Sequence, residues 1–180
     1  MDITRQRGFT LIELITTLAV GLILLSVGIP NMRQLLAGNQ QRSEINTLVT
    51  HFHLAGSEAV KRATRVVLCP SDDHLVCDGS FNWGDGFIIF ADENANRRRD
   101  PDEELLRIYQ NGFESQISIN STSGRRRLTY QADGSSPGSN VTITLCHPQN
   151  IINPKAIIIS NNGRTRISER RPDGSALTCS

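Results

Sequence analysis

An acidic series in the middle of this 180-residue chain has a spacing that could support metal chemistry. Four oxygen-bearing side chains match positions 1, 3, 5 and 12 of an EF-hand loop, which places oxygen ligands around Ca²⁺: Asp92, Asn94, Asn96 and Glu103. Position 6 of such a loop is Gly because the chain turns sharply there, but this sequence has Arg97 at that position, and two more arginines follow it. We therefore expect a solvated hairpin loop in which Asn and Asp side chains cap turns, rather than a calcium site.

Four cysteines could form disulfides or bind a metal: Cys69, Cys77, Cys146 and Cys179. If they lie outside the inner membrane, oxidation is expected, and four cysteines allow three pairings. Proximity in sequence favours Cys69 with Cys77 and Cys146 with Cys179. The competing idea is a zinc site, but the sequence has no C-x-x-C spacing.

The remaining titratable residues do not form an enzyme motif. The sequence contains no G-x-S-x-G, P-loop or H-E-x-x-H string. His51 and His53 are two residues apart in a predicted helix, so they lie on nearly opposite sides and cannot share a metal ion. We expect no enzymatic activity, metal or cofactor, and we expect His74 and His147 to be surface residues beside cysteines.

Arginines are concentrated near the end of the chain. Residues 9–120 contain nine basic and fourteen acidic side chains, whereas residues 121–180 contain eight basic and three acidic ones, a net charge of +5. Four of these arginines lie in or soon after a G-R-x-R string: Arg164, Arg166, Arg170 and Arg171. In an extended chain Arg164 and Arg166 would point to the same face. A second cluster comes from residues 125–127.

Spaced guanidinium groups of this kind suit phosphate groups. Only nine aromatic residues occur in the chain, which argues against base stacking as the main contact. The pattern predicts sequence-independent DNA binding. The alternatives are a solvated face, or a patch that docks on acidic neighbouring subunits.

An apolar segment runs from Phe9 to Ile29, 21 residues that as a helix would reach about 31 Å, close to the roughly 30 Å core of a bilayer. Pro30 follows directly, without the small-residue cleavage site of a secretory signal. Arg5 and Arg7 precede the segment, so the positive-inside rule places the first residues in the cytoplasm and the rest of the chain outside. We expect residues 9–29 to be a single transmembrane helix.

Glu13 is a carboxylate inside this apolar segment, where a charge costs a few kcal/mol on insertion scales. One explanation is that Glu13 lies near enough to the helix start to snorkel to the headgroups. Residues 8–14 suggest a second explanation for Glu13. Their sequence is Gly-Phe-Thr-Leu-Ile-Glu-Leu and follows a short basic leader. This string resembles the processing site of type IV prepilins and type II secretion pseudopilins. The resemblance implies a leader of residues 1–8, cleavage after Gly8 by a prepilin peptidase, and methylation of the new amino group on Phe9.

Cleavage after Gly8 would supply Glu13 with a partner. The new amine at Phe9 is four residues away, one helical turn, on the same chain or on a neighbouring subunit. An unpaired charge in an apolar bundle costs several kcal/mol, so the pair could fix the axial register of helices in a filament.

The rest of the chain is predicted to form one amphipathic helix followed by strands. Beyond Pro30, apolar residues recur near a 3.6 period from Ile45 to Ala63, so we expect residues 30–63 to continue the helix. Six short runs rich in β-branched or aromatic residues follow, separated by turn residues: 65–69, 87–90, 117–120, 127–131, 141–145 and 156–160. The expected fold is α+β, with the long N-terminal helix packed on an antiparallel β-sheet and residues 64–180 forming a β-rich periplasmic head.

Residues 83–107, from Trp-Gly-Asp-Gly to Leu-Leu-Arg, are similar to the hairpin of the GspH/FimT (FimU) class of minor pilins. With the N-terminal string, the likeness spans most of the chain and implies a type IV pilin-like fold. It implies a minor pilin involved in pilus assembly, made in the inner membrane and carried to the cell surface of a Gram-negative bacterium, with other pilins as partners. The G-R-x-R element looks like the motif through which FimT-type pilins contact DNA during natural transformation. The alternative is a GspH-type pseudopilin of a type II secretion system, and a membrane-anchored enzyme is a third interpretation.

Overall fold

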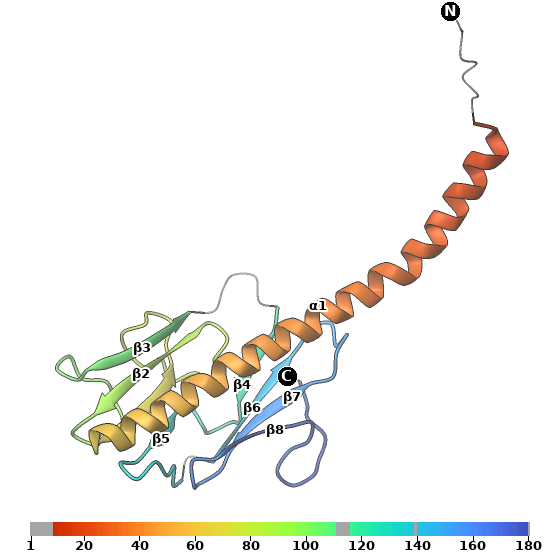
Figure 1. Ribbon diagram of the computed structural model, residues 1–180. Helices are drawn as coiled ribbons and strands as arrows, with labels where there is room; N and C mark the ends of the chain where they lie inside the picture. Colours follow the sequence, from red (N-terminus) through yellow and green to blue (C-terminus); the bar gives the residue numbers. More distant parts are fainter. Residues whose placement is uncertain (1–8, 111–115, 139, 180) are drawn as a thin grey trace, which may run out of the picture. The chain divides into compact units, whose positions relative to one another are not determined.

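The computed structural model describes residues 9–110, 116–138 and 140–179 (Figure 1). A single helix, α1, runs from Leu11 to Arg62. The chain divides into two units, one up to Leu36 and one from Ala37 onward, and each is described by itself.

The first unit contains an apolar, exposed stretch of α1. Its large side chains from Phe9 to Leu36 are exposed, and the helix is long and apolar enough to cross a membrane. Pro30 lies inside the helix, where it cannot donate to the carbonyl four residues earlier. Asn31 donates from its side-chain amide to the Val27 carbonyl at 2.9 Å, next to the carbonyl that Pro30 leaves unbonded.

The second unit begins with the amphipathic part of α1. Its buried residues recur every three or four positions, as the 3.6 period predicts: Ala37, Gln41, Glu44, Ile45, Leu48, Phe52, Ala55 and Ala59. Gly56 lies on the same stripe, and a Cβ added there would lie 3.4 Å from the ring of Tyr130. The helix ends in a Schellman arrangement in which Thr64 N–H donates to the Ala59 carbonyl.

Eight strands form two antiparallel sheets that pack with this helix. Sheet A has the order β3-β2-β1-β5 and sheet B the order β4-β6-β7-β8. The strands of sheet A are β1 Arg65–Pro70, β2 Gly86–Asp92, β3 Leu105–Gln110 and β5 Leu128–Tyr130. The strands of sheet B are β4 Ser118–Ser121, β6 Val141–Cys146, β7 Lys155–Ile159 and β8 Thr165–Ser168.

The α+β fold with one long helix on antiparallel strands is therefore confirmed, with two additions. The sequence predicts six strands in one sheet, but β3 and β8 are also strands, and the strands divide between two sheets. Both added strands lie at sheet edges and are partly exposed, so their sequences mix apolar and polar residues instead of forming an apolar run.

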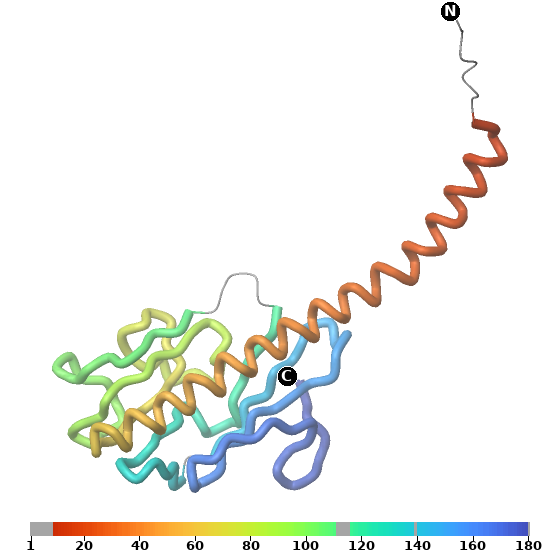
Figure 2. Tube along the Cα trace, viewed as in Figure 1, coloured from red at the N-terminus to blue at the C-terminus, as the bar shows by residue number. Residues whose placement is uncertain are grey.

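One hydrophobic core joins α1 to both sheets. Figure 1 and the tube in Figure 2 show residues 37–62 running along strands of both sheets. Among the side chains of this core are Leu48, Phe52, Leu68, Trp83, Phe87, Leu128, Ile143 and Ile157. The rings of Phe52 and Trp83 meet edge to face, with their centroids 6.2 Å apart.

Two disulfides fasten segments to these sheets. Cys69 in β1 is bonded to Cys77, and Cys146 in β6 is bonded to Cys179, which is the pairing that proximity in sequence favours. The second disulfide holds the C-terminal segment against sheet B, where Leu177 packs on Ala156 and Ile158. By the chain-entropy model the two bridges stabilise the fold by roughly 2–3 and 3–4 kcal/mol, respectively.

Candidate functional site

The turn between β7 and β8 positions the first arginines of the basic region. Ser160 N–H donates to the Arg164 carbonyl at 3.0 Å, and Arg164 N–H donates to Asn162 Oδ1 at 3.3 Å. Gly163 has a φ of +77°, and a Cβ at this position would overlap the Gly134 carbonyl oxygen. Only glycine fits here, because the turn is both left-handed and pressed against a neighbouring backbone.

The register of sheet B assigns Arg166 to one face. Arg166 lies opposite Ile158, which lies opposite Thr142. Thr165 lies opposite Ile159, a residue of the core. Because side chains alternate along a strand, Arg166 belongs to the face of sheet B that points away from the core, here called the outer face.

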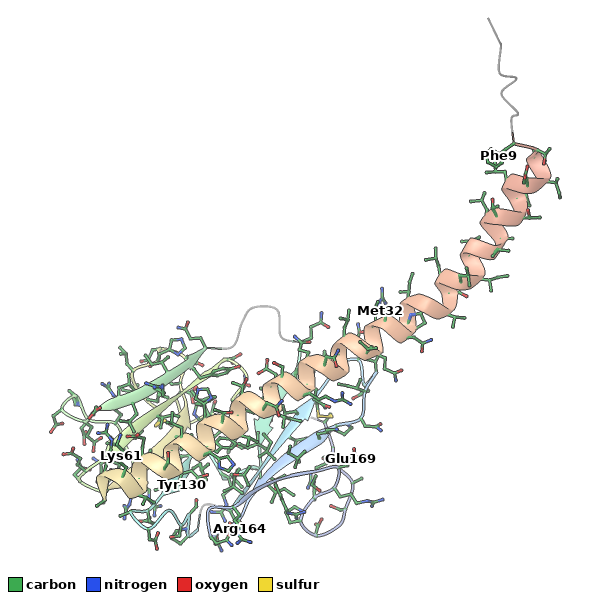
Figure 3. The ribbon with its side chains drawn as sticks, in the orientation of Figure 1. Phe9, Met32, Lys61, Tyr130, Arg164 and Glu169 are labelled. Carbon is green, nitrogen blue, oxygen red and sulfur yellow. A yellow bond between two sulfur atoms is a disulfide. The ribbon has the colours of Figure 1, made fainter. Side chains whose placement is uncertain are left out.

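Arg164, labelled in Figure 3, directly precedes β8, and Arg166 is the second residue of that strand. Both are exposed. Within the described residues, neither guanidinium group has a hydrogen bond or an ion pair. No carboxylate of the described residues therefore neutralises these two guanidinium groups.

Arg170 and Arg171 lie in the C-terminal segment, where both are exposed. Arg170 donates from its guanidinium to the Gly174 carbonyl at 3.1 Å, and Arg171 donates to Thr178 Oγ1 at 2.7 Å. Both acceptors are uncharged. Arg171 also acts on Asp173, whose pKa is held below its usual range by hydrogen bonds from Ser175 and, to a smaller extent, by the Arg171 charge.

Arg171 also lines a pocket of about 610 Å³ on the outer face. The pocket lies between β4, β6 and the segment 171–178, and its walls carry hydroxyl and amide groups such as those of Asn120, Thr142 and Thr144. Arg125 and Arg171 provide positive charge, and Asp173 provides the one carboxylate among the lining residues. The sequence does not predict this pocket, because it depends on β4 pairing with β6 and on the disulfide that holds the C-terminal segment.

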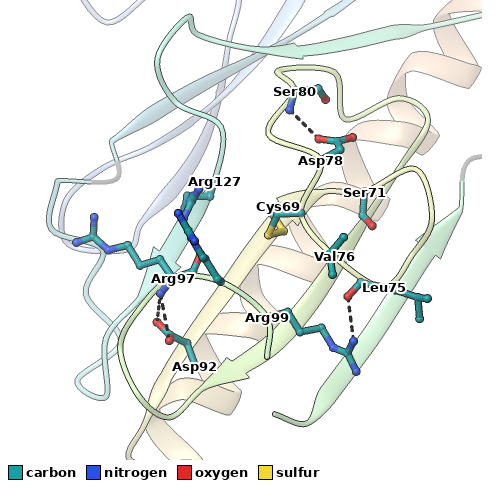
Figure 4. The surroundings of a disulfide bond; sticks show 12 residues. Cys69, Ser71, Leu75, Val76, Asp78, Ser80, Asp92, Arg97, Arg99 and Arg127 are labelled. Atoms are coloured by element: carbon teal, nitrogen blue, oxygen red, sulfur yellow. Dashed lines mark hydrogen bonds between the residues drawn. A yellow bond between two sulfur atoms is a disulfide. The ribbon is translucent and has the colours of Figure 1, made fainter. Parts of the chain in front are cut away.

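The acidic series forms a hydrogen-bonded loop. Asp92 accepts from the backbone N–H of Arg97 at 3.3 Å (Figure 4). Glu103 accepts from the N–H groups of Glu93 and Asp100 at 3.1 and 3.0 Å. Asp100 accepts from two asparagine side chains, and these bonds hold the pKa of its carboxyl below the usual range. The side chains cap turns as expected, but Asp92 and Glu103 are buried and not solvated.

One of the two histidines that the sequence predicts at the surface is buried. His147 is 4% exposed, and its Nδ1 accepts from the N–H of Gln149, so the prediction of a surface position for this residue is wrong. The position directly after β6 and beside the Cys146–Cys179 disulfide explains its burial. Among the described residues, no group of three or more His, Cys, Asp or Glu side chains is placed to hold a metal ion.

The N-terminal site is described from Phe9 onward, and Gly8 lies outside the described residues. Thr10 and Glu13 form a capping box at the start of α1. Thr10 N–H donates to Glu13 Oε2 at 3.3 Å, and Glu13 N–H donates to Thr10 Oγ1 at 3.3 Å. The Glu13 side chain therefore folds back toward Phe9, which is 88% exposed.

Comparison with known proteins covers nearly the whole chain. Residues 44–163 match the family model for type II transport protein GspH, and residues 3–29 match that for the prokaryotic N-terminal methylation motif. The pilin-like protein PilA1 of Thermus thermophilus is 30% identical over 167 residues, which cover 90% of this chain and 98% of that protein.

Two crystal structures of the type IV minor pilin FimU of Pseudomonas aeruginosa share the fold. One aligns with a TM-score of 0.59 and 21% identity, covering 77% of this chain and 93% of FimU. The other aligns with a TM-score of 0.55 and 20% identity, covering 76% and 96%. The methylation motif, the GspH match and this fold together show that the chain belongs to the GspH family of pilin-like proteins, in the GspH/FimT class of minor pilins.

Proposed function

We propose that this minor pilin is cleaved after Gly8 by a prepilin peptidase, methylated at Phe9 and incorporated into a type IV pilus. Residues 9–29 would anchor it in the inner membrane with its first residues in the cytoplasm, and residues 30–63 would continue the helix into the periplasmic head of residues 64–180. The match of residues 3–29 to the methylation motif and the exposed apolar helix support this proposal. Pilins of this family are structural subunits, and no enzymatic step is part of the proposal.

We further propose that the pilin binds DNA without regard to sequence, for DNA uptake in natural transformation. The observation that carries this proposal is the pair Arg164 in the β7–β8 turn and Arg166 on the outer face, both exposed and without a carboxylate partner among the described residues. Arg170 and Arg171 add positive charge in the segment that follows β8, where their guanidinium groups donate to uncharged acceptors. Contacts of arginine with phosphate fix position and orientation on DNA without reading its sequence.

Salt dependence tests the DNA proposal, because each phosphate that an arginine binds releases counterions. We expect the full chain, purified in an uncharged detergent, to bind duplex DNA with an affinity that falls steeply as salt rises. The double variant R164Q/R166Q should reduce the slope of log K against log salt by about 2, or roughly 0.9 for each phosphate that is no longer neutralised.

A charge-matched control separates a local contact from a general effect of net charge. Arg98 and Arg107 are exposed and lie on the acidic part of the chain, so R98Q/R107Q removes the same charge elsewhere. This control should keep the wild-type slope within about 0.5. Equal weakening in the two double variants, or salt-insensitive binding by the wild type, would contradict phosphate binding at Arg164 and Arg166.

The second candidate function is that of a pseudopilin in a type II secretion system. The match of residues 44–163 to the type II transport protein GspH favours it. In that case the basic face would dock on acidic neighbouring subunits, and charge complementarity would set the orientation of the subunits. Absence of DNA binding by the wild-type chain, together with loss of secretion when the gene is deleted, would favour this second function.

A further inference from the structure

A second, smaller pocket of about 230 Å³ lies beside the segment 124–127. All of its charged lining side chains are arginines: Arg97, Arg125, Arg126 and Arg127. The other lining residues are Gly124, Thr129 and Gly138, so none of the described residues that line the pocket has a carboxylate or an aromatic ring. Four like charges around one small space repel one another, and a bound anion would offset this repulsion.

The guanidinium groups of this arginine pocket bind only neutral groups. Arg127 donates to the carbonyl of Arg97, and Arg126 lies over the ring of Phe81, 5.0 Å from its centroid. Arg125 donates to the Gly138 carbonyl and to Asn140 Oδ1. The guanidinium of Arg97 has no hydrogen bond or ion pair within the part of the chain that the structure describes.

The buried carboxylate near Arg97 does not line the pocket. Asp92 is 1% exposed, and its oxygens accept from the backbone N–H of Arg97. Arg65 Nη1 lies 4.0 Å from Asp92 Oδ2 and forms the ion pair of this carboxylate. Figure 4 shows the Arg97 side chain directed away from Asp92, with Arg127 beside it. The guanidinium donors of Arg97 therefore remain available to a ligand.

The arginine pocket is connected to the outer face of sheet B. Arg125 lines both this pocket and the larger one that Arg171 lines. The segment that Arg125 binds, at Gly138 and Asn140, follows Ser136, whose N–H donates to the carbonyl of Asn161 at 2.8 Å in the β7–β8 turn. Hydrogen bonds thus link the turn that carries Arg164 to the wall of the arginine pocket.

We propose that the arginine pocket is a second phosphate-binding site, and that a nucleic-acid strand held at Arg164 and Arg166 continues past Arg125 into it. The proposal rests on the proposed DNA binding and extends it to a site that no family motif marks. Arginine forks match the oxygens of a phosphodiester in bidentate geometry, and the lack of aromatic lining residues fits binding of the backbone and not of bases.

The double variant R97Q/R126Q tests this site. Both side chains are exposed, and neither guanidinium makes a hydrogen bond within the described residues. The variant loses the contact of Arg126 with the Phe81 ring, so it should still fold, with a slightly lower thermal midpoint. With the full chain in uncharged detergent and a mixed-sequence oligonucleotide longer than the roughly 4–16 nucleotides of one binding site, we expect the salt slope to fall by about 2. The affinity at about 0.1 M salt should fall at least about tenfold.

Two further variants complete the test. R98Q/R107Q removes equal charge outside the pocket and should bind like the wild type, and R97K/R126K keeps the charge and should restore most of the slope. A wild-type slope in R97Q/R126Q together with a reduced slope in R164Q/R166Q would overturn the second site and leave the first in place. If the wild type binds no DNA, both proposals fail. A reduced slope in R97Q/R126Q alone would support the pocket and overturn the assignment at β8.

Discussion

The Glu13 carboxylate has one hydrogen-bond partner in the structure, Thr10, and one expected partner, the amine that cleavage would create at Phe9. This carboxylate accepts hydrogen bonds from Thr10 in the described residues, which satisfies an otherwise unpaired N–H of the first helical turn. Removal of residues 1–8 would create an amine at Phe9, one turn away. The capping geometry directs the carboxylate to the end of the helix where that amine would be, so cap and ion pair are compatible.

The substitutions Glu13→Gln and Glu13→Ala separate these two roles. Glutamine can keep the capping box but removes the charge, whereas alanine removes both. If charge neutralisation fixes the register, both variants should insert into the membrane and both should be absent from sheared pili, as judged by immunoblot of membrane and pilus fractions. Normal incorporation of Glu13→Gln would leave only the capping role.

Tyr130 is a residue at which stability should depend on pH. Its ring is 2% exposed beneath Gly56, and burial raises the pKa of its hydroxyl to about 12. A raised pKa means that the unfolded chain loses this proton first, near pH 10. The stabilisation is therefore complete below about pH 10 and is lost as pH rises toward 12.

Between about pH 10 and 12, deprotonation of Tyr130 in the unfolded chain should lower the free energy of unfolding by about 1.4 kcal/mol per pH unit. Tyr130→Phe should remove that slope. Burial and the hydrogen bond to Glu44 also raise the pKa of Tyr109, which should give a residual slope in both proteins. Urea unfolding at several pH values measures the difference, and identical slopes in wild type and variant would contradict this role of Tyr130.

At the scale of elements, the β7–β8 hairpin is the part that presents the basic residues, and Gly163 controls its geometry. Gly163→Ala should be costly because the residue has positive φ and its new Cβ would meet the Gly134 carbonyl oxygen. Gly174→Ala is a matched control, because Gly174 has a φ of +84° but open space around it.

We expect Gly163→Ala to lower the free energy of unfolding by about 1–3 kcal/mol more than Gly174→Ala, since only the first adds a steric clash to the backbone strain. Denaturant unfolding of the two variants measures this difference. Equal losses of stability in the two variants would show that the β7–β8 turn accommodates the added Cβ of Gly163→Ala without a steric penalty.

The elements that the sequence predicts well are those with a clear hydrophobic period. The stripe from Ile45 to Ala59 on α1 and the apolar runs of β1, β2, β6 and β7 appear as expected. The sequence does not predict the edge strands β3 and β8. One side of each strand lacks a partner strand and their residues are partly exposed, so neither strand forms a continuous apolar run. Sequence spacing brings Arg164 and Arg166 together, but Arg97 and Arg127 are 30 residues apart and meet only through the fold.

At the scale of the whole molecule, charge is separated along the chain. Residues 121–180 carry a net charge of +5 and contain β6, β7 and β8 of sheet B, whereas residues 9–120 carry a net charge of −5. Such separation can attract DNA, and it can also align copies of the protein or other pilins in a fibre. The two uses are distinguished by measuring DNA affinity and incorporation into fibres separately for the charge-matched variants, because DNA affinity reports on phosphate binding and incorporation reports on subunit docking.

The proposed assembly into a fibre and the proposed DNA capture would both require that this chain become a processed pilin subunit. The most direct test is the intact mass of the protein recovered from sheared fibres. We expect the mass of residues 9–180 with both disulfides formed and one methyl group on the Phe9 amine. A mass that still includes Met1 to Gly8 in assembled fibres would contradict processing after Gly8 and, with it, the proposed role of the Phe9 amine.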